Sequence, residues 1–239
     1  MSLEKALVKI KEDLKSWDKF LGNITSNKDF HQVIQKVIEG RKERTVLPSV
    51  TDIFRAYKLV KPKDVKVVII GQDPYPQNGV ADGLCFSTQN AETPASLRLL
   101  FRKIAFEYGK YNYKDFFKTN NLENWARQGV LLLNSRLTVF ENEPNSHTDF
   151  NWDTTILGST IHYLSRLVQP QVHIYIGNSA KKLVFYSNPG LTKDLFLKHP
   201  SAVLRNNIME RDWFEVPIFK ETNAYLIKNG LTPIEWRLK

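Results

Sequence analysis

The hydrophobic residues of this 239-residue chain follow two different patterns. In four short segments the apolar residues are nearly consecutive and many are β-branched, which is typical of strands buried on both faces of a parallel sheet. These segments are Val65–Ile70, Val130–Leu133, Val172–Ile176 and Leu195–Lys198. We therefore predict four buried strands that run parallel to one another.

Elsewhere apolar residues return every three or four positions, a spacing that predicts amphipathic helices. The expected helices are Leu3–Phe20, Phe30–Ile38, Asp52–Leu59, Pro94–Tyr108, Trp152–Val168, Ser179–Tyr186 and Phe214–Asn229. Ser49 or Thr51 is expected to cap the third helix and Thr93 the fourth. The last helix is expected to stop at Asn229-Gly230.

The alternation of strands and helices indicates parallel crossover units and therefore an α/β fold. We expect a three-layer sandwich with a central four-stranded parallel sheet flanked by helices. The sequence contains no internal repeat, low-complexity tract or linker. Residues 1–239 are therefore expected to form a single domain, on which the helices of residues 1–50 pack.

Polar residues directly follow each predicted strand. They are Gln72-Asp73, Asn134-Ser135, Gly177-Asn178-Ser179 and His199-Pro200-Ser201. The carboxyl ends of parallel strands meet at one edge of a sheet, where α/β proteins bind their ligands. The loop after the first strand, GQDPYPQNGVADGLCFS, adds a phenol and a phenyl ring from Tyr75 and Phe86. We therefore predict an active site at this edge.

The composition narrows the class of partner. The net charge of +9 favours a polyanion such as nucleic acid, although the same charge would also serve solubility. The single cysteine, Cys85, excludes an internal disulfide. We see no secretory signal and no apolar segment of membrane-spanning length, so we expect a cytoplasmic protein without membrane contact. A nucleotide-binding protein is disfavoured because no G-x-G-x-x-G or Walker motif is present.

Four motifs occur in a characteristic order: GQDPY, GLCFS, WARQGVLLLNSRLTV and HPS. As a set they resemble the uracil-DNA glycosylases of the Asp–Asn–His family (family 1), over roughly Asp52 to Trp236. The resemblance implies a monomeric repair enzyme that flips uracil out of single- or double-stranded DNA and hydrolyses its N-glycosidic bond. The products would be free uracil and an abasic site, and neither metal nor cofactor would be used. A proteinaceous glycosylase inhibitor is a further partner that the resemblance implies.

The resemblance also assigns roles around the base. Asp73 would orient the attacking water and stabilise positive charge on the sugar, and His199 would hydrogen-bond the departing base at O2. Asn134 would read the uracil edge, and Phe86 would stack on the flipped ring. Tyr75 would stand against C5 of the base, and Gln72 would lie beside the uracil.

Other positions correspond to DNA-contacting residues of that family. Ser96, Ser201 and the pair Asn178 and Ser179 would grip phosphates. An apolar wedge is needed to fill the gap that the flipped nucleotide leaves. By register the wedge is Val203, with Leu204 one step away, and the sequence leaves both open.

Elementary chemistry supports these roles. The carboxamide of Asn134 offers one donor and one acceptor, which match N3–H and O4 of uracil and mismatch cytosine twice. Each unsatisfied buried group costs about 1–3 kcal/mol. A rigid Tyr75 ring could exclude the methyl group of thymine by overlap. Taken singly, Asn134 and His199 also fit ordinary turn positions, and Phe86 also fits a core position.

The chain departs from the family pattern at three places. Pro76 and Asp82 stand where His is usual, and Ala95 stands where a proline is usual. One rival interpretation is a DNA-binding subunit of a replication complex that has kept the fold and lost the chemistry, which the intact Asp73, Asn134 and His199 disfavour. Another rival is a glycosylase for mismatched thymine, which Tyr75 disfavours.

Overall fold

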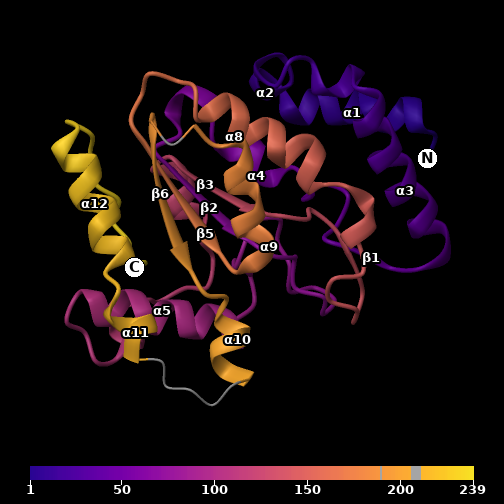
Figure 1. Ribbon diagram of the computed structural model, residues 1–239. Coiled ribbons are helices and arrows are strands. Elements are labelled where there is room, and N and C mark those ends of the chain that lie inside the picture. The colour runs from indigo at the N-terminus through magenta and orange to yellow at the C-terminus, as the bar shows by residue number, and fades with distance from the viewer. Residues whose placement is uncertain (189, 206–210) are drawn as a thin grey trace.

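The computed structural model describes residues 1–188, 190–205 and 211–239, with only the backbone described at 204, 205, 211 and 212. Its centre is a four-stranded sheet in the order β3-β2-β5-β6, and every neighbouring pair is parallel (Figure 1). The strands are β2 (Val67–Gly71), β3 (Val130–Asn134), β5 (Gln171–Ile176) and β6 (Thr192–Leu197). The predicted α/β class with a parallel sheet flanked by helices is confirmed.

The register of the strands brings their carboxyl ends level. Gly71 pairs with Asn134 at the ends of β2 and β3, and Ile176 pairs with Leu197 at the ends of β5 and β6. All residues of β2, β3 and β5 are buried, which is why β2 and β3 are largely continuous apolar runs, whereas β5 also buries Gln171 and His173. The polar residues that follow each strand therefore start from one edge of the sheet.

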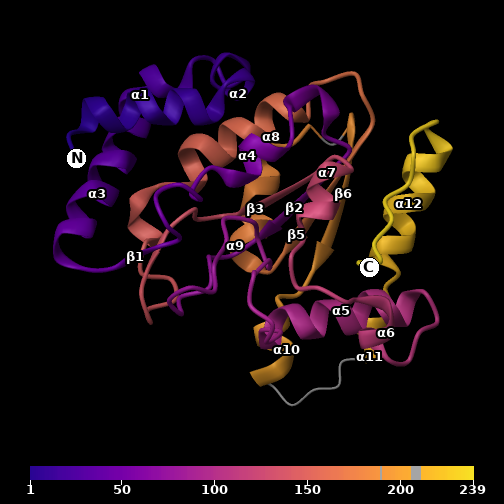
Figure 2. The ribbon, with the colours of Figure 1, turned by 180° about the vertical axis from the view of Figure 1, so that it is seen from behind.

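The amino-terminal helices differ from the prediction of one long helix. The helix over Leu3–Phe20 is interrupted at Lys15, whose φ is 42°, and forms α1 (Leu3–Leu14) and α2 (Ser16–Phe20). The break allows Trp17, which is fully buried, to donate from Nε1 to the carbonyl oxygen of Val60 over 2.7 Å. The following helix, α3 (Lys28–Glu43), is longer than predicted, and α1–α3 lie together at one corner of the molecule (Figures 1 and 2).

Two predicted helix caps are wrong. Helix α4 (Arg55–Leu59) begins too late to be capped by Ser49 or Thr51, and Ser49 instead hydrogen-bonds Asp52. Helix α5 (Ala95–Glu107) begins after Pro94, so Thr93 is free to donate to Oδ1 of Asn120 over 2.8 Å. The Ser49 hydroxyl thus finds a partner within its own loop, and the Thr93 hydroxyl finds one in the loop before α7.

The predicted helix over Trp152–Val168 is a π-helical turn, η4 (Asp153–Leu157), followed by α8 (Gly158–Leu164). The predicted helix over Ser179–Tyr186 is a short α9 (Asn178–Lys181) continued by the 3-10 segment η5 (Lys182–Tyr186). The last helix, α12 (Ile218–Lys228), is capped by Asn229 as predicted but begins later than predicted, because Phe214 belongs to the separate helix α11 (Arg211–Glu215). The remaining elements are η1 (Ile24–Ser26), β1 (Val46–Leu47), η2 (Pro62–Asp64), α6 (Tyr113–Phe116), α7 (Glu123–Arg127), β4 (Val139–Phe140), η3 (Thr148–Phe150), α10 (Pro200–Arg205) and α11 (Arg211–Glu215).

Helices α5, α10 and α11 gather at the end of the molecule toward which the arrow of β6 points (Figures 1 and 2). A buried ion pair on α5 stabilises the packing at this end of the molecule. Nζ of Lys103 lies 2.7 Å from Oε1 of Glu107, and both side chains are almost fully buried. Lys103 also donates to the carbonyl oxygen of Phe214, while Oε2 of Glu107 accepts from the backbone N–H groups of Phe219 and Lys220. The pair thus joins α5 to the start of α12.

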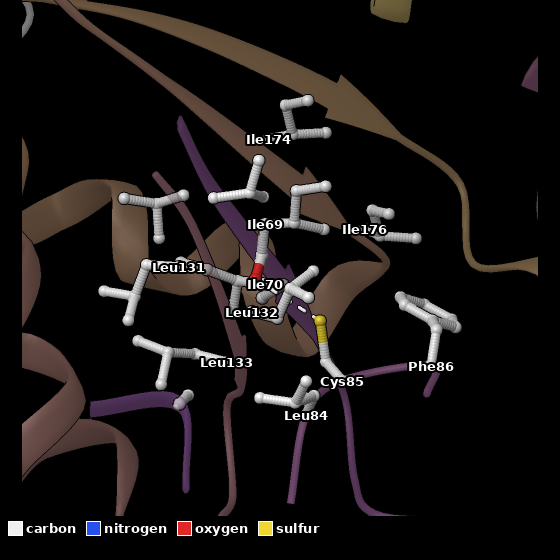
Figure 3. Packing of buried hydrophobic residues seen from close by; sticks show 14 of the residues in the cluster. Ile69, Ile70, Leu84, Cys85, Phe86, Leu131, Leu132, Leu133, Ile174 and Ile176 are labelled. Carbon is white, nitrogen blue, oxygen red and sulfur yellow. Dashed lines mark hydrogen bonds between the residues drawn. The ribbon is translucent and has the colours of Figure 1, made fainter. Parts of the chain in front are cut away.

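The loop after β2 folds back onto the sheet. Leu84, Cys85 and Phe86 pack beside the ends of the strands, where Figure 3 draws them close to Ile69 and Ile70. Sγ of Cys85 donates to the carbonyl oxygen of Ile69 over 3.4 Å. Within the described ranges, no helix has both the length and the apolar character that crossing a membrane requires.

Candidate active site

A cavity of about 310 Å³ opens at the carboxyl edge of the sheet. Eight of the residues predicted to form the site line it: Gln72, Asp73, Tyr75, Phe86, Ser96, Asn134, His199 and Ser201. The rest of the lining is mostly proline, together with Gln77 and Ala95. Side chains that are distant in sequence therefore meet around one hollow.

Asp73 is held by three donors although its side chain is only 6 % exposed. Nη1 of Arg136 donates to Oδ1 over 2.9 Å. Oδ2 accepts from the backbone N–H of Asn145 over 2.9 Å and from Nε2 of Gln72 over 3.1 Å. Such a set of donors fixes the orientation of the carboxylate.

Gln72 supports this arrangement with the amide nitrogen of its side chain. Nε2 also donates to Oδ1 of Asn145 over 2.9 Å, so the side chain bridges Asp73 and Asn145. The backbone carbonyl oxygen of Gln72 accepts from the backbone N–H of Arg136 and from the hydroxyl of Ser135. These hydrogen bonds connect the loop after β2 to the loop after β3 at the residue next to Asp73.

The absence of a side chain at Gly71 creates room for Asn134 and Phe86. A Cβ atom at Gly71 would lie 2.7 Å from Oδ1 of Asn134 and 3.2 Å from Cε2 of Phe86. Both side chains are 8 % exposed, so only their cavity faces remain open. The carboxamide that would read a base and the ring that would stack on it are therefore adjacent.

Phe86 has a backbone φ of 64°, which bulky residues seldom adopt. Its ring centroid lies 5.9 Å from that of His199, with 31° between the ring planes. The carbonyl oxygen of Phe86 accepts the hydroxyl hydrogen of Tyr75 over 2.9 Å. The unusual backbone thus turns the ring toward the site and the carbonyl toward Tyr75.

The hydrogens of Tyr75 and Ser96 can be assigned by counting. The single hydroxyl hydrogen of Tyr75 goes to Phe86, so Ser96, whose Oγ lies 3.2 Å from the phenol oxygen, is the donor of that contact. Burial raises the pKa of Tyr75, which keeps the phenol protonated. Its aromatic ring is consequently held rigidly at the cavity wall.

The ring of His199 has a defined tautomer. The backbone N–H of Ser201 donates to Nδ1 over 3.2 Å, and Oγ of Ser201 lies 2.8 Å from the same nitrogen. Because a backbone N–H can only donate, Nδ1 is an acceptor and the ring hydrogen is on Nε2. Gly177, with φ 91°, permits the close packing, since a Cβ there would lie 2.8 Å from Cβ of His199.

Asp82, one of the departures from the family pattern, organises the loop that carries Phe86. Its carboxylate accepts from the hydroxyl of Ser87 over 2.7 Å and from Nε2 of Gln89 over 2.9 Å. Oδ2 also lies 2.9 Å from Nη1 of Arg55. Asp82 is outside the cavity lining, and its contacts fix the shape of the loop.

Sequence reasoning missed two residues of the site, Arg136 and Asn145. Arg136 lies within the third motif, two positions after Asn134, so its charge close to the strand end was a usable signal. Asn145 acts through its backbone N–H and its amide oxygen. Because that contact depends on how a distant loop folds, no local sequence pattern indicates it.

Among the described residues, no group of His, Cys, Asp and Glu side chains is arranged to hold a metal ion.

A family model matches residues 57–223, and its description is the Uracil DNA glycosylase superfamily. This chain belongs to that superfamily. The "Uracil-DNA glycosylase" of Mesomycoplasma hyopneumoniae is 36% identical over 224 residues, covering 93% of this chain and 98% of the relative. "Uracil-DNA glycosylase 1" of Listeria innocua is 36% identical over 231 residues, covering 94% and 98%. The resemblance inferred from the four motifs is confirmed.

Solved structures of the uracil DNA glycosylase superfamily share the fold. A variant of mimivirus UNG, crystallised in complex with UGI, superposes with a TM-score of 0.81 at 25% identity. The match covers 94% of this chain and 88% of that chain. Mimivirus uracil-DNA glycosylase itself gives the same TM-score at 22% identity, which supports the fold alone.

The residues that the resemblance assigned to DNA contacts do not all line the cavity. Asn178 is exposed and Ser179 half-buried at the start of α9, and neither lines the cavity. The hydroxyl of Ser201 is engaged with His199. Val203 requires a correction: its side chain is 6 % exposed and belongs to the hydrophobic core, so it does not project as a wedge. The side chain of Leu204 lies outside the described residues.

Proposed function

We propose that this superfamily member is a uracil-DNA glycosylase that releases uracil from DNA and leaves an abasic site. The observation that carries the proposal is the convergence of Asp73, Asn134 and His199 with Phe86 on one cavity. An enzyme that acts on a base must take it out of the duplex and hold it in such a pocket. The net charge of +9 complements the phosphates of the substrate.

In the proposed complex uracil occupies the space above Gly71. Phe86 stacks on the ring, which is worth about 1–3 kcal/mol per base. The carboxamide of Asn134 pairs with O4 and N3–H, while cytosine would leave both groups mismatched. Sites built on such polar matching reject the wrong ligand by roughly 10⁴-fold. The rigid ring of Tyr75 stands against C5 and excludes the methyl group of thymine.

The proposed chemistry divides between the two sides of the glycosidic bond. As the bond between C1′ and N1 breaks, its electron pair leaves with uracil and positive charge develops on the sugar. The Asp73 carboxylate stabilises the sugar and orients the water that adds to C1′. The hydrogen on Nε2 of His199 is donated in a hydrogen bond to O2 of the departing base. Groups fixed in advance for developing charge are the main source of such catalysis.

We further propose that the enzyme acts as a monomer on single- and double-stranded DNA in the cytoplasm, without a cofactor. Ser96, Asn178, Ser179 and Ser201 would contact the DNA backbone through hydroxyl, amide or backbone N–H groups. For Ser96 the backbone N–H is the better candidate, because its hydroxyl hydrogen is directed to Tyr75. A UGI-type inhibitor, as bound to the mimivirus neighbour, is a proposed protein partner.

Release of free uracil from an oligonucleotide with a single uracil tests the function directly. We expect wild-type protein to release the base and the Asp73→Asn variant to be slower by at least about 100-fold. The variant, purified in parallel, also controls for a contaminating host glycosylase. DNA binding by wild-type protein with no base release would reject the proposal and favour a non-catalytic DNA-binding subunit.

A further inference from the structure

Arg136 contacts the proposed catalytic carboxylate from behind. Its side chain is 11 % exposed, and Nη1 lies 2.9 Å from Oδ1 of Asp73. Its backbone N–H donates to the carbonyl oxygen of Gln72 over 3.1 Å. Arg136 is absent from the described lining of the cavity, whereas Asp73 lines it. The contact through which the guanidinium can act on the position of a catalytic group is therefore its hydrogen bond to Asp73.

The acceptor positions of Asp73 can be counted. A carboxylate has about four lone-pair positions, two on each oxygen. Oδ2 uses both of its positions, for the N–H of Asn145 and for Nε2 of Gln72. Oδ1 uses one position for Arg136. The remaining position on Oδ1 is therefore the one available to a water molecule in the cavity.

We propose that Arg136 is a positioning residue that presents Oδ1 of Asp73 to the attacking water. The guanidinium is planar and charged, so its hydrogen bond fixes both the rotation and the location of the carboxylate. Without it, Oδ1 would have no protein donor among the described hydrogen bonds of Asp73, and only the two donors to Oδ2 would oppose rotation of the carboxylate about its bond to Cβ. A misplacement of about 1 Å in such a site can cost roughly 100-fold in rate.

The pair also shapes the electric field of the site. The negative carboxylate of Asp73 belongs to the cavity lining, and the positive guanidinium of Arg136 does not. The two charges thus form a dipole whose negative end faces the place where the sugar would develop positive charge. Arg136 therefore supports the catalytic group without contacting substrate.

The test compares cleavage rate with DNA affinity for Arg136→Leu, Arg136→Gln and Arg136→Lys. This inference rests on the proposed function, so each rate is expressed relative to wild-type uracil release. We expect Arg136→Leu to lower the single-turnover rate by about 100-fold, while affinity for an uncleavable uracil analogue in DNA changes less than about 3-fold. Arg136→Lys, which keeps a charge but loses the planar fork, should recover part of the rate.

Chemical rescue separates positioning from general structural support. Free guanidinium at millimolar concentration should restore part of the rate of Arg136→Ala, and the same concentration of sodium should not. The matched control is Arg127→Leu, which removes an exposed arginine far from the cavity lining and should keep the wild-type rate. Thermal unfolding of each variant verifies that the fold is intact.

Two results would overturn the inference. The first is a wild-type cleavage rate in folded Arg136→Leu, or in Arg136→Gln should the Leu variant not fold. The second is a loss confined to affinity for DNA, which would mark Arg136 as a phosphate contact. Absence of uracil release by wild-type protein would instead reject the proposed function itself, so the two failures are distinguishable.

Discussion

At the scale of single residues, the hydroxyl groups of Tyr75 and Ser96 fix part of the cavity wall, because each donates its hydrogen to one defined acceptor. Tyr75 donates to Phe86 and receives from Ser96, so its ring cannot swing away from the cavity wall without breaking both contacts. Such rigidity matters because a single methyl group distinguishes thymine from uracil. Hydrogen bonds to the base cannot detect that methyl group, whereas a fixed ring can exclude it by overlap.

Replacing Tyr75 by Ala should therefore relax the discrimination against thymine. We expect the ratio of uracil release to thymine release to fall by about 100-fold in Tyr75→Ala, since one methyl group in a pocket is worth about 10–200-fold. Tyr75→Phe keeps the ring and should retain most of the discrimination. Matched oligonucleotides with uracil or thymine opposite guanine measure both rates. An unchanged ratio in Tyr75→Ala would show that another residue guards C5.

At the scale of elements, the sequence predicted the strands best and the interruptions of helices worst. The four strands were found within about two residues in most cases because continuous burial leaves a continuous apolar run, as in β2 and β3. The break at Lys15 follows from the burial of Trp17 against Val60, which is a tertiary contact. The helical spacing of apolar residues along the sequence does not indicate such a contact.

The same distinction applies to the site. Asp73, Asn134 and His199 were predictable because each ends or follows a strand, and the register of parallel strands places such positions at one edge. The contact between Arg136 and Asp73 was not predictable, because it depends on how the loops after β2 and β3 are positioned relative to each other. The inward orientation of Val203 likewise depends on how α10 packs against α5.

The buried ion pair of α5 should be essential to the fold at this end of the molecule. Burial lowers the pKa of Lys103 and raises that of Glu107, so each group depends on the other to remain charged. Replacing Lys103 by Met would leave the Glu107 carboxylate buried without its cation. We expect the free energy of unfolding to fall by about 3–5 kcal/mol, measured by urea denaturation.

A matched control for this prediction is Lys114→Met, which removes an exposed lysine of α6 and should change stability by less than about 0.5 kcal/mol. Equal stability of Lys103→Met and Lys114→Met would mean that the buried pair adds nothing to the attachment of α12.

At the scale of the whole molecule, two buried histidines make stability depend on pH. Burial lowers the pKa of His147 from 6.5 to about 4 and that of His173 from 6.5 to about 3. Below pH 6.5 the unfolded chain binds protons on these residues and the folded chain does not, so acid favours unfolding. Their contribution is fully present above pH 6.5 and is lost as the pH falls toward the folded values.

Urea denaturation at several pH values checks this expectation. Between pH 6 and pH 4.5 the free energy of unfolding should fall by up to about 1.4 kcal/mol per pH unit for each histidine. Asp194, whose carboxylate lies 3.7 Å from Nδ1 of His173, would reduce the loss if it remained charged. The slope should be smaller in His173→Asn. A stability that is flat over this range would contradict the assigned burial of the two rings.

The backbone at Phe86 has a consequence for how this protein could be stabilised. A bulky residue held at a φ of 64° costs on the order of 1–3 kcal/mol, and glycine would relieve that cost. The same exchange would remove the aromatic surface on which an extruded base can rest. Phe86 also packs in the hydrophobic core, where losing a buried phenyl ring costs about 3–5 kcal/mol, so relieving the strained backbone in this way would lower stability and empty the cavity together.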